Sequence, residues 1–349
     1  MKVAFYSYPS AFQNPGGGEV QLDKTMEYLK KAGVKVKKFD QWNDKLEEFD
    51  IFHVFGSVKD CLGLVKTARS KGVKIALSTI FWSDFRRAIN EARSLKDRAG
   101  LLVRQAAKSF FPRFPSARRE LMLASDILFP NGQGEADQLA KYFSVDRNKL
   151  FVVPNGVDER FRKVSPDEFT KKYGIKDFIL YVGRIEPRKN QLNFIRAMKS
   201  YNEKPIVFIG APVSDYEDYY GQCREEATEN MHFIGHVGHD SPLLEAAYAS
   251  CTVFALTSWF ETPGLSALEA ALSGANIVIT DGGCTREYFG DMAVYASPNN
   301  VTGIRLAVSE ACKTPKNDKL VKHVFENFTW DKVAARTIEG YEKILNGNI

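Results

Sequence analysis

The sequence predicts an α/β protein made of two doubly wound domains, each a parallel sheet with helices on both faces. Along most of the 349 residues, short apolar runs alternate with helical segments, which is typical of strands joined by crossover helices. Residues 154–166, PNGVDERFRKVSP, contain turn residues and charges but no apolar period, as a linker should. With 44% hydrophobic and 26% charged residues, the chain has the composition of an ordinary globular protein.

The first domain is predicted over residues 1–160. Its strands are expected at the apolar runs 2–8, 34–40, 50–56, 73–79, 126–130 and 150–153. Its helices are expected at 20–32, 65–70 and 134–142. His53 falls on or beside a strand, and two interpretations are open: a hydrogen-bonded histidine of the core, or a ligand contact.

Three consecutive glycines lie between the first strand and the first helix, in the loop 10–19 (SAFQNPGGGE). Glycines ahead of a helix let backbone N–H groups face a phosphate, so Gly17 and Gly18 are candidate phosphate contacts. A dinucleotide-binding fingerprint would place its glycines directly after the strand, whereas about eight residues intervene here, which argues against an NAD site. A flexible surface turn is the alternative interpretation.

The second domain is predicted over residues 161–328. Its strands are expected at 178–182, 205–210, 231–235, 251–257 and 275–280. Arg184 and Lys189 follow the first of these strands, at the sheet edge where open parallel sheets bind ligands. Two cations at this edge suit a diphosphate, although either one alone could be an ordinary surface charge.

Two glutamates bracket the loop and helix that follow the strand at 251–257. Glu261 lies in the loop and Glu269 lies within the helix, while Gly264 and Leu265 stand at the helix start. Free backbone N–H groups at a helix start suit an anion. An acid, an anion pocket and a second acid in a row fit a sugar, a diphosphate and a ribose. The alternative is that both glutamates are solvated charges on a helix face.

Four segments of the chain, in order, resemble motifs of retaining glycosyltransferase family 4. The last contains two glutamates separated by seven residues. The segments are NPGGGE (14–19), VPNGVD (153–158), YVGRIEPRKNQ (181–191) and the stretch 258–287. The resemblance implies the GT-B fold, in which two doubly wound Rossmann-like domains face each other across a cleft. It also implies that the last helix, 329–349, crosses back from the donor-binding second domain onto the acceptor-side first domain.

The resemblance further implies transfer of a hexose from a nucleotide-diphosphate sugar, of UDP or GDP type, to an acceptor hydroxyl with retention of configuration. Glu261, Arg184 and Lys189 would be the catalytic residues, and Glu269 would hold the ribose. Gly17, Gly18, Gly264 and Leu265 would contact the donor through their backbone. The acceptor would be a glycan or a lipid-linked sugar. A non-catalytic protein that binds nucleotide sugars, or a regulatory protein recruited to a membrane, is the alternative.

The chain departs from the family pattern at two places. Where family members often have a histidine that contacts the donor sugar, this sequence has Phe81, Trp82 and Asp84. Pro263 stands where the family usually has an aromatic residue, and proline removes one backbone N–H. No D-x-D motif occurs, so we expect no metal site and no cofactor besides the donor substrate.

The segment 86–119 carries most of the positive charge. It holds 10 Lys or Arg and 2 acidic residues, a balance of +8, whereas the rest of the chain (38 basic, 41 acidic) has −3. Apolar residues recur every three or four positions along it, which predicts an amphipathic basic helix. Arg93, Lys96, Arg104 and Lys108 either meet an anionic membrane or an acidic acceptor, or stay solvated while the apolar stripe packs on the domain.

Neither a disulfide framework nor a zinc site is predicted, because the five cysteines are odd in number and widely spaced. Met1 to Phe12 does not resemble a signal peptide, and no apolar run approaches the roughly 18 residues of a membrane span. We therefore expect a cytoplasmic protein, either free or peripheral on the inner face of the membrane. Nucleic acid is not among the expected partners.

Overall fold

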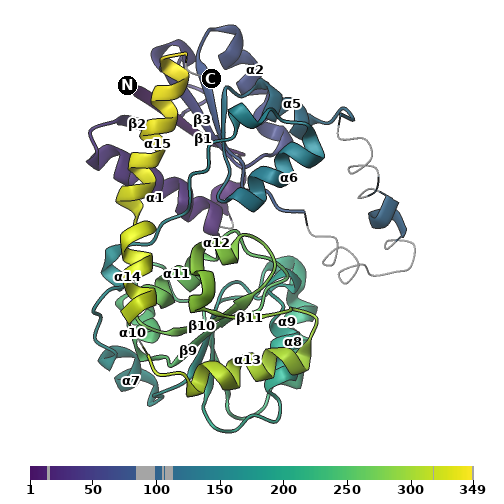
Figure 1. Ribbon diagram of the computed structural model, residues 1–349, viewed down its shortest axis with the longest axis vertical. Coiled ribbons are helices and arrows are strands. Elements are labelled where there is room, and N and C mark those ends of the chain that lie inside the picture. Colours follow the sequence, from purple (N-terminus) through teal and green to yellow (C-terminus); the bar gives the residue numbers. More distant parts are fainter. Residues whose placement is uncertain (14–15, 84–98, 104–105, 107–112, 317, 348–349) are drawn as a thin grey trace. The chain divides into compact units, whose positions relative to one another are not determined.

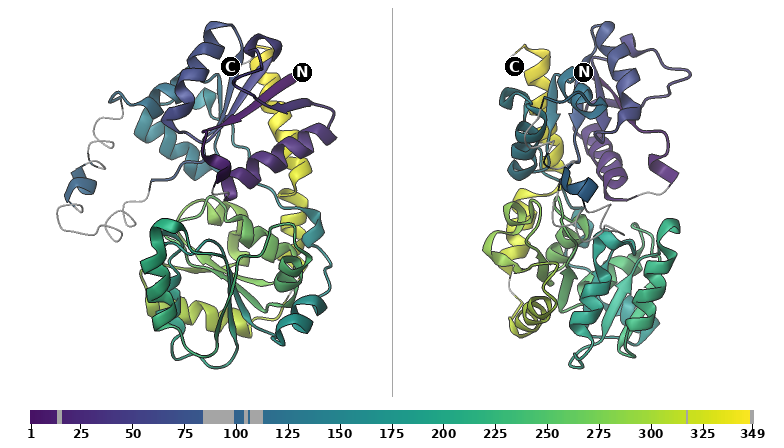
Figure 2. Two further views of the ribbon diagram at one scale, coloured as in Figure 1. Left: turned by 180° about the vertical axis from the view of Figure 1, so that it is seen from behind. Right: turned by 90° about the vertical axis from the view of Figure 1, so that its right-hand side faces the viewer.

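The computed structural model describes residues 1–349 except 14–15, 84–98, 104–105, 107–112, 317 and 348–349. The chain divides into two compact units (Figure 1). Unit 1 comprises Met1–Gly156 and Phe328–Ile349, and unit 2 comprises Val157–Asn327. Each unit contains a parallel sheet flanked by helices (Figure 1 and Figure 2), so the predicted α/β fold class is confirmed.

Five parallel strands form the sheet of unit 1, in the order β2-β1-β3-β4-β5. They are β1 (Lys2–Ser7), β2 (Lys35–Lys38), β3 (Ile51–Phe55), β4 (Lys74–Ser78) and β5 (Ile127–Phe129). Every residue of β3 is buried, as expected of a central strand covered on both faces. The predicted strand at 150–153 is not formed as such, because its pairing is limited to an isolated bridge between Leu128 and Leu150.

The labelled α-helices of unit 1 cover this sheet. They are α1 (Gly17–Lys31), α2 (Leu62–Ser70), α5 (Ala117–Ala124), α6 (Gln133–Phe143) and α15 (Trp330–Leu345). The last helix, α15, packs against α1, so the carboxyl-terminal segment of the chain belongs to the same compact unit as the first strand.

Six parallel strands form the sheet of unit 2, in the order β11-β10-β9-β6-β7-β8. They are β6 (Ile179–Val182), β7 (Ile206–Ile209), β8 (Met231–Gly235), β9 (Val253–Leu256), β10 (Asn276–Thr280) and β11 (Val294–Ala296). The chain winds from β6 to β8 in one direction and from β9 to β11 in the other. The switch point of this doubly wound sheet therefore lies between β6 and β9.

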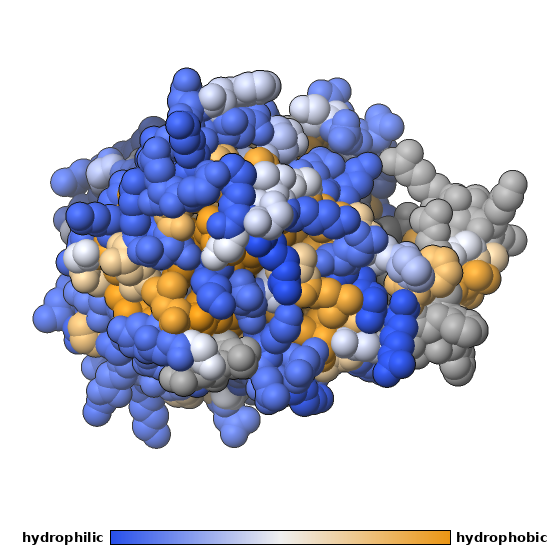
Figure 3. Space-filling model, turned by 90° about the horizontal axis from the view of Figure 1, so that it is seen from above, coloured by the Kyte–Doolittle hydropathy of each residue, from blue (hydrophilic) through white to orange (hydrophobic). Residues whose placement is uncertain are grey.

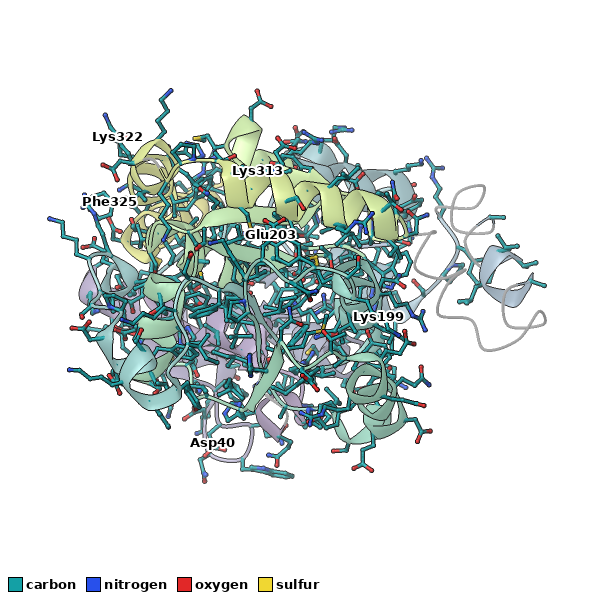
Figure 4. The ribbon with its side chains drawn as sticks, turned by 90° about the horizontal axis from the view of Figure 1, so that it is seen from below. Asp40, Lys199, Glu203, Lys313, Lys322 and Phe325 are labelled. Carbon is teal, nitrogen blue, oxygen red and sulfur yellow. The ribbon has the colours of Figure 1, made fainter. Side chains whose placement is uncertain are left out.

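Helices also cover both faces of the second sheet (Figure 2). They are α7 (Asp167–Tyr173), α8 (Gln191–Met198), α9 (Glu217–Glu226), α10 (Pro242–Ser250), α11 (Leu265–Leu272), α12 (Thr285–Phe289), α13 (Val301–Lys313) and α14 (Asp318–Asn327). The helix α14 buries Leu320 and Val324 while Lys322 points outward (Figure 4), the pattern of an amphipathic surface helix.

Candidate functional site

The candidate site lies at the carboxyl end of the unit 2 sheet, at the switch point between β6 and β9. Two loops leave the sheet there, 183–190 after β6 and 257–264 after β9. At the end of β7, a Cβ on Gly210 (φ 150°) would lie 2.0 Å from the carbonyl oxygen of Gly183, so only glycine permits this close approach. Open parallel sheets bind ligands at such a switch point.

Lys189 and Glu261 form a buried ion pair in these loops. The Nζ of Lys189 donates to Oε1 of Glu261 at 2.6 Å, and the two side chains are 13% and 8% exposed. Burial alone would raise the pKa of Glu261, but attraction to Lys189 and Arg188 outweighs it and lowers that pKa. Burial also lowers the pKa of Lys189, against the attraction of the same carboxylate. Two of the predicted catalytic residues are thus in direct contact.

Arg188 extends this pair into a chain of alternating charges. Its Nη1 lies 3.6 Å from Oε1 of Glu261, and its Nη2 lies 3.2 Å from Oε1 of Glu186. The same Glu186 oxygen lies 3.5 Å from Nη2 of Arg184, whose side chain is 41% exposed. Glu186 therefore holds two guanidinium groups at the mouth of the loop, and Arg184 is the cation with the most solvent contact.

Backbone hydrogen bonds fix the turn that carries these cations. The N–H of Trp259 donates to the carbonyl of Arg188 at 3.0 Å, which ties the loop after β9 to the loop after β6. Asn190 has a left-handed backbone (φ 63°), and its Nδ2 donates to the carbonyl of Thr257 at 2.9 Å. The amide of Asn190 thus compensates for a conformation that other residues adopt at a cost.

The backbone of Glu261 is held by the DGG turn after β10. Its N–H donates to the carbonyl of Gly282 at 3.1 Å, and its carbonyl accepts from the N–H of Cys284 at 2.9 Å. A Cβ on Gly283 (φ 99°) would lie 1.8 Å from the carbonyl oxygen of Glu261. The backbone position of Glu261 therefore depends on Gly283, which follows it in the chain after α11 and β10.

The helix α11 begins at the predicted place. Gly264, its N-cap, has a left-handed backbone (φ 87°), and Leu265 is its first residue. The first N–H groups of an α-helix have no partner within the helix, so this end carries partial positive charge. An anion contact was predicted at Gly264 and Leu265 because they stand at a helix start. The structure places both residues at that helix start.

Glu269 lies within α11 in a polar cluster rather than on a solvated helix face. Its Oε1 is 2.7 Å from Nε2 of His239, and its Oε2 accepts from the hydroxyl of Tyr248 at 2.8 Å. Burial would lower the pKa of His239, but the hydrogen bond to Glu269 and the attraction of its negative charge together outweigh burial and raise that pKa. Glu269 is only 6% exposed, so the interpretation as an ordinary surface charge is wrong.

In unit 1, Gly17 and Gly18 form the first turn of α1 instead of the loop before it. The helix starts three residues earlier than the apolar pattern suggests, because Glu19 closes its first turn: Oε2 of Glu19 accepts from the N–H of Gly16 at 2.7 Å. A Cβ on Gly18 would lie 3.4 Å from Cδ1 of Ile80. This is an ordinary van der Waals distance, so the packing around Gly18 leaves room for a Cβ.

His53 is a histidine of the core, one of the two interpretations that its position on a strand leaves open. It lies in β3, with Nδ1 2.6 Å from the hydroxyl of Tyr341 and Nε2 2.9 Å from Oγ of Ser78. Burial lowers its pKa to about 3, so the ring is neutral at physiological pH. It joins β3 to α15 and is not a ligand contact.

Residues 166–324 match the family model described as glycosyl transferases group 1. This part of the chain is similar to the members of that family. The match spans the switch point and contains Arg184, Lys189, Glu261 and Glu269. The recognition of a glycosyltransferase from the sequence motifs is therefore confirmed, whereas assignment to family 4 stays a prediction.

The curated relatives of the chain are distant. An uncharacterized glycosyltransferase of Methanocaldococcus jannaschii, MJ1607, is 27% identical over 228 residues, 59% of this chain and 57% of that protein. The O-antigen chain mannosyltransferase B of Escherichia coli is 24% identical over 257 residues, covering 69% and 64%. A D-inositol 3-phosphate glycosyltransferase of Paenarthrobacter aurescens is 26% identical over 254 residues, covering 63% and 58%. The chain thus spans about three fifths of the length of these relatives.

Solved structures share the fold along nearly the whole chain. A sucrose-phosphate synthase from Thermosynechococcus elongatus superposes with a TM-score of 0.76 at 14% identity, covering 99% of this chain and 100% of that one. Anabaena HepE in complex with UDP gives a TM-score of 0.72 at 16% identity, covering 98% and 100%. These likenesses confirm the predicted GT-B class of two Rossmann-like domains.

The sequence interpretation missed three residues of the candidate site. Arg188 and Glu186 flank the predicted Lys189, and the alternating charges of IEPRKN were the available signal for them. His239 was not among the predicted site residues, and its partner Glu269 lies 30 residues away in the chain. Nothing in the spacing of the sequence indicates that these two side chains meet.

Several predicted features fall outside the described residues. Arg93, Lys96, Arg104 and Lys108 of the basic segment lie there, as does Asp84. In the part of the chain that the structure describes, no group of three or more metal-binding side chains is found. Among those same residues, no helix has the length and apolar character needed to cross a membrane.

Proposed function

We propose that the protein transfers a sugar from a nucleotide-diphosphate-sugar donor to a hydroxyl group of an acceptor. The observation that carries this proposal is the buried pair of Lys189 and Glu261, extended by Arg184, Glu186 and Arg188 at the switch point of unit 2. Three cations meet two carboxylates in this cluster, which leaves one excess positive charge. A leaving diphosphate gains negative charge, and fixed cations stabilise it.

Each charged residue has a role in this proposal. Arg184 and Lys189 contact the diphosphate, with the arginine suited to bidentate contact and the lysine acting as a point charge. Glu261 orients the sugar and stabilises positive charge at its reacting carbon. Glu269 accepts hydrogen bonds from the ribose hydroxyls. Because Lys189 already neutralises Glu261 in the absence of a ligand, the carboxylate is kept ionised in a buried position until the donor arrives.

Backbone groups complete the donor contacts that we propose. The N–H groups of Gly264 and Leu265 at the start of α11 contact a phosphate, and Gly17 and Gly18 at the start of α1 are further candidate phosphate contacts. The resemblance to retaining enzymes supports retention of the anomeric configuration. Complexes of Anabaena HepE with UDP and with UDP-glucose support a donor of this chemical class. We propose a glycan or a lipid-linked sugar as the acceptor.

A panel of nucleotides tests the proposal. UDP, GDP and ADP and their glucose and mannose conjugates are added separately, and the melting temperature is measured. A ligand at 100 times its dissociation constant adds about 2.7 kcal/mol to the free energy of unfolding. Transfer to a synthetic acceptor is then followed by NMR, which also reports the anomeric configuration of the product. Binding without hydrolysis or transfer would instead identify a non-catalytic nucleotide-sugar-binding protein, and binding of none of the nucleotides would contradict both functions.

We also propose that transfer needs no metal ion, because Arg184, Arg188 and Lys189 can supply the positive charge that a divalent cation would otherwise provide. The expected result is full activity after extensive dialysis against EDTA. An inactive dialysed enzyme that regains activity with Mg²⁺ or Mn²⁺, but not with Na⁺ at equal ionic strength, would contradict this proposal.

A further inference from the structure

Glu269 belongs to a polar chain of four side chains drawn from four elements of unit 2. Arg160 comes from the turn at Glu159–Phe161, His239 from the loop after β8, Tyr248 from α10 and Glu269 from α11. Arg160 donates through Nη2 to the carbonyl of His239 at 2.8 Å, and the same Nη2 lies 3.2 Å from Nδ1 of the His239 ring. The ring in turn contacts Glu269 at 2.7 Å.

The position of Arg160 determines which nitrogen of the neutral histidine carries the hydrogen. A guanidinium group has only donors, so Nδ1 of His239 accepts from it and Nε2 carries the ring hydrogen. This Nε2–H points to Oε1 of Glu269. A protonated ring would keep the same Nε2–H, so the donor to Glu269 is present in both charge states of His239.

Charged groups surround Arg160 and keep it in place. Its Nη1 lies 2.9 Å from Oε1 of Glu245 on α10, and its Nη2 lies 3.4 Å from Oδ1 of Asp240. The guanidinium carbon lies 4.6 Å from the centroid of the Phe161 ring. Arg160 is therefore anchored independently of Glu269, so it can hold His239 rather than being held by it.

The Glu269 carboxylate can accept more hydrogen bonds than the two that it receives from His239 and Tyr248. An ionised carboxylate has about four acceptor positions. His239 takes one of them on Oε1 and Tyr248 takes one on Oε2, so each oxygen keeps one position for another donor. Vicinal hydroxyl groups of a ribose are two donors at matching spacing. A flexible glutamate would present its oxygens in many rotamers, whereas this one has a fixed carboxylate plane.

We infer that His239, held from behind by Arg160, is a positioning residue that orients the Glu269 carboxylate for the two hydroxyl groups of the donor ribose. The inference rests on the proposed function, in which Glu269 binds the ribose. His239 acts through Glu269 and does not touch the reacting atoms. It should therefore determine how well the site distinguishes a ribose from a deoxyribose, and it should have little effect on the recognition of phosphate.

The experiment compares wild-type protein with His239→Ala and His239→Gln by calorimetric titration. The ligands are whichever of UDP, GDP and ADP binds the wild-type protein, its 2′-deoxy analogue, and inorganic pyrophosphate. We expect His239→Ala to weaken nucleoside diphosphate binding by about tenfold or more, the loss expected for one hydrogen bond to a charged group. It should also abolish the preference over the 2′-deoxy analogue and leave pyrophosphate binding unchanged.

The glutamine variant separates positioning from folding. A glutamine amide can donate from nearly the position of Nε2, so His239→Gln should restore the preference for the ribose. His232→Ala on β8 is the matched histidine control and should behave as wild type in all three titrations. In this design only the loss of the 2′-hydroxyl preference, with rescue by glutamine, supports the inference.

Three outcomes would overturn it. If His239→Ala keeps the wild-type preference for the ribonucleotide, His239 does not orient Glu269. If pyrophosphate binding falls as much as nucleotide binding, the substitution has disturbed the unit as a whole and the role is structural. If the wild-type protein binds no nucleoside diphosphate, the proposed function fails and this inference fails with it, whereas the first two outcomes leave the proposed function intact.

Discussion

At the scale of single residues, Lys189 combines two tasks that use different atoms. Its ammonium group pairs with Glu261, and its carbonyl accepts a hydrogen bond from the buried hydroxyl of Tyr181. The turn is further held by the backbone contact between Arg188 and Trp259. Because the turn is fixed through the backbone, replacing the Lys189 side chain should change the charge of the site more than its shape.

The first prediction concerns the cations of this turn. Replacing Arg184 or Lys189 with Met should lower turnover by about ten- to a thousandfold, because each removes one charge that stabilises the leaving diphosphate. Removing Lys189 also leaves Glu261 buried without its closest partner, so the melting temperature is measured for each variant. Arg196→Met, which removes a surface ion pair with Glu226 on another helix of the unit, is the control. Wild-type turnover in both site variants would exclude them from the mechanism.

The second prediction concerns His53, whose pKa is lowered to about 3 in the folded protein from 6.5. Below pH 6.5 the unfolded chain binds a proton that the folded protein does not, so stability falls as the pH decreases toward 3. The slope approaches about 1.4 kcal/mol per pH unit from this group. His53→Gln should be less stable than wild type at pH 7, yet lose less stability between pH 7 and pH 5. If the melting temperatures of the two proteins fall by the same amount between pH 7 and pH 5, His53 is not buried in its neutral form.

At the scale of elements, the close packing of α15 in unit 1 depends on two glycines. A Cβ on Gly340 would lie 2.4 Å from Cε1 of Phe129 and 3.2 Å from Cδ1 of Phe151. A Cβ on Gly156 would lie 2.8 Å from Cδ2 of Trp330, at the first turn of the same helix. The helix therefore approaches β5 and its following segment more closely than a side chain would allow.

The third prediction follows from this close approach. Gly340→Ala should destabilise unit 1 by about 1 to 3 kcal/mol, the usual cost of overpacking, because a ring of the core must move. Gly63→Ala in α2 is the matched control: no atom lies within 4 Å of its added Cβ, and alanine favours a helix. Thermal unfolding and hydrogen exchange of β5 and α15 measure the effect. Equal stability of the two variants would mean that α15 does not pack as described.

Much of the element pattern follows from the sequence, because buried parallel strands are short apolar runs. All six strands of unit 2 except β11 were predicted, and so was the helix α11 with its glycine start. The helix α9, EDYYGQCREE, escaped prediction since it is polar on most of its surface and buries little besides Cys223. The start of α1 was placed too late because glycines are poor helix formers, and the bond from Gly16 to Glu19 overrides that preference.

The site was predictable only in part, for a different reason. Lys189 and Glu261 each stand beside a strand end, so their proximity follows from the order of strands in the sheet. Arg188, Glu186 and His239 act through side-chain contacts that depend on rotamers and loop paths, and a sequence does not show these. Glu269 was identified from a motif, whereas its partners His239 and Tyr248 came from two other elements.

At the scale of the whole molecule, charge is distributed unevenly along the chain. The net charge of +5 arises from 48 basic and 43 acidic residues, and the segment 86–119 alone contributes +8. Hydrophilic residues make up most of the surface seen in Figure 3, with hydrophobic residues between them. A local excess of this size attracts anionic partners over about one Debye length, roughly 10 Å at 0.1 M salt.

The last prediction concerns an anionic membrane as the partner of this segment. Each basic residue near an anionic lipid surface contributes on the order of 1 kcal/mol, so binding should fall steeply with salt. We expect the protein to cosediment with vesicles containing phosphatidylserine, but not with neutral ones, at low salt. Changing four basic residues of the segment to Glu should abolish vesicle binding while leaving donor binding intact; they are Arg93, Lys96, Arg104 and Lys108.

The control carries the same change of charge at four exposed lysines of unit 2: Lys171, Lys172, Lys313 and Lys322 (the last two labelled in Figure 4). If the control loses vesicle binding as fully as the first variant, attraction depends on total charge and not on the segment. If wild-type protein ignores anionic vesicles, the segment serves the fold or a soluble acidic acceptor instead.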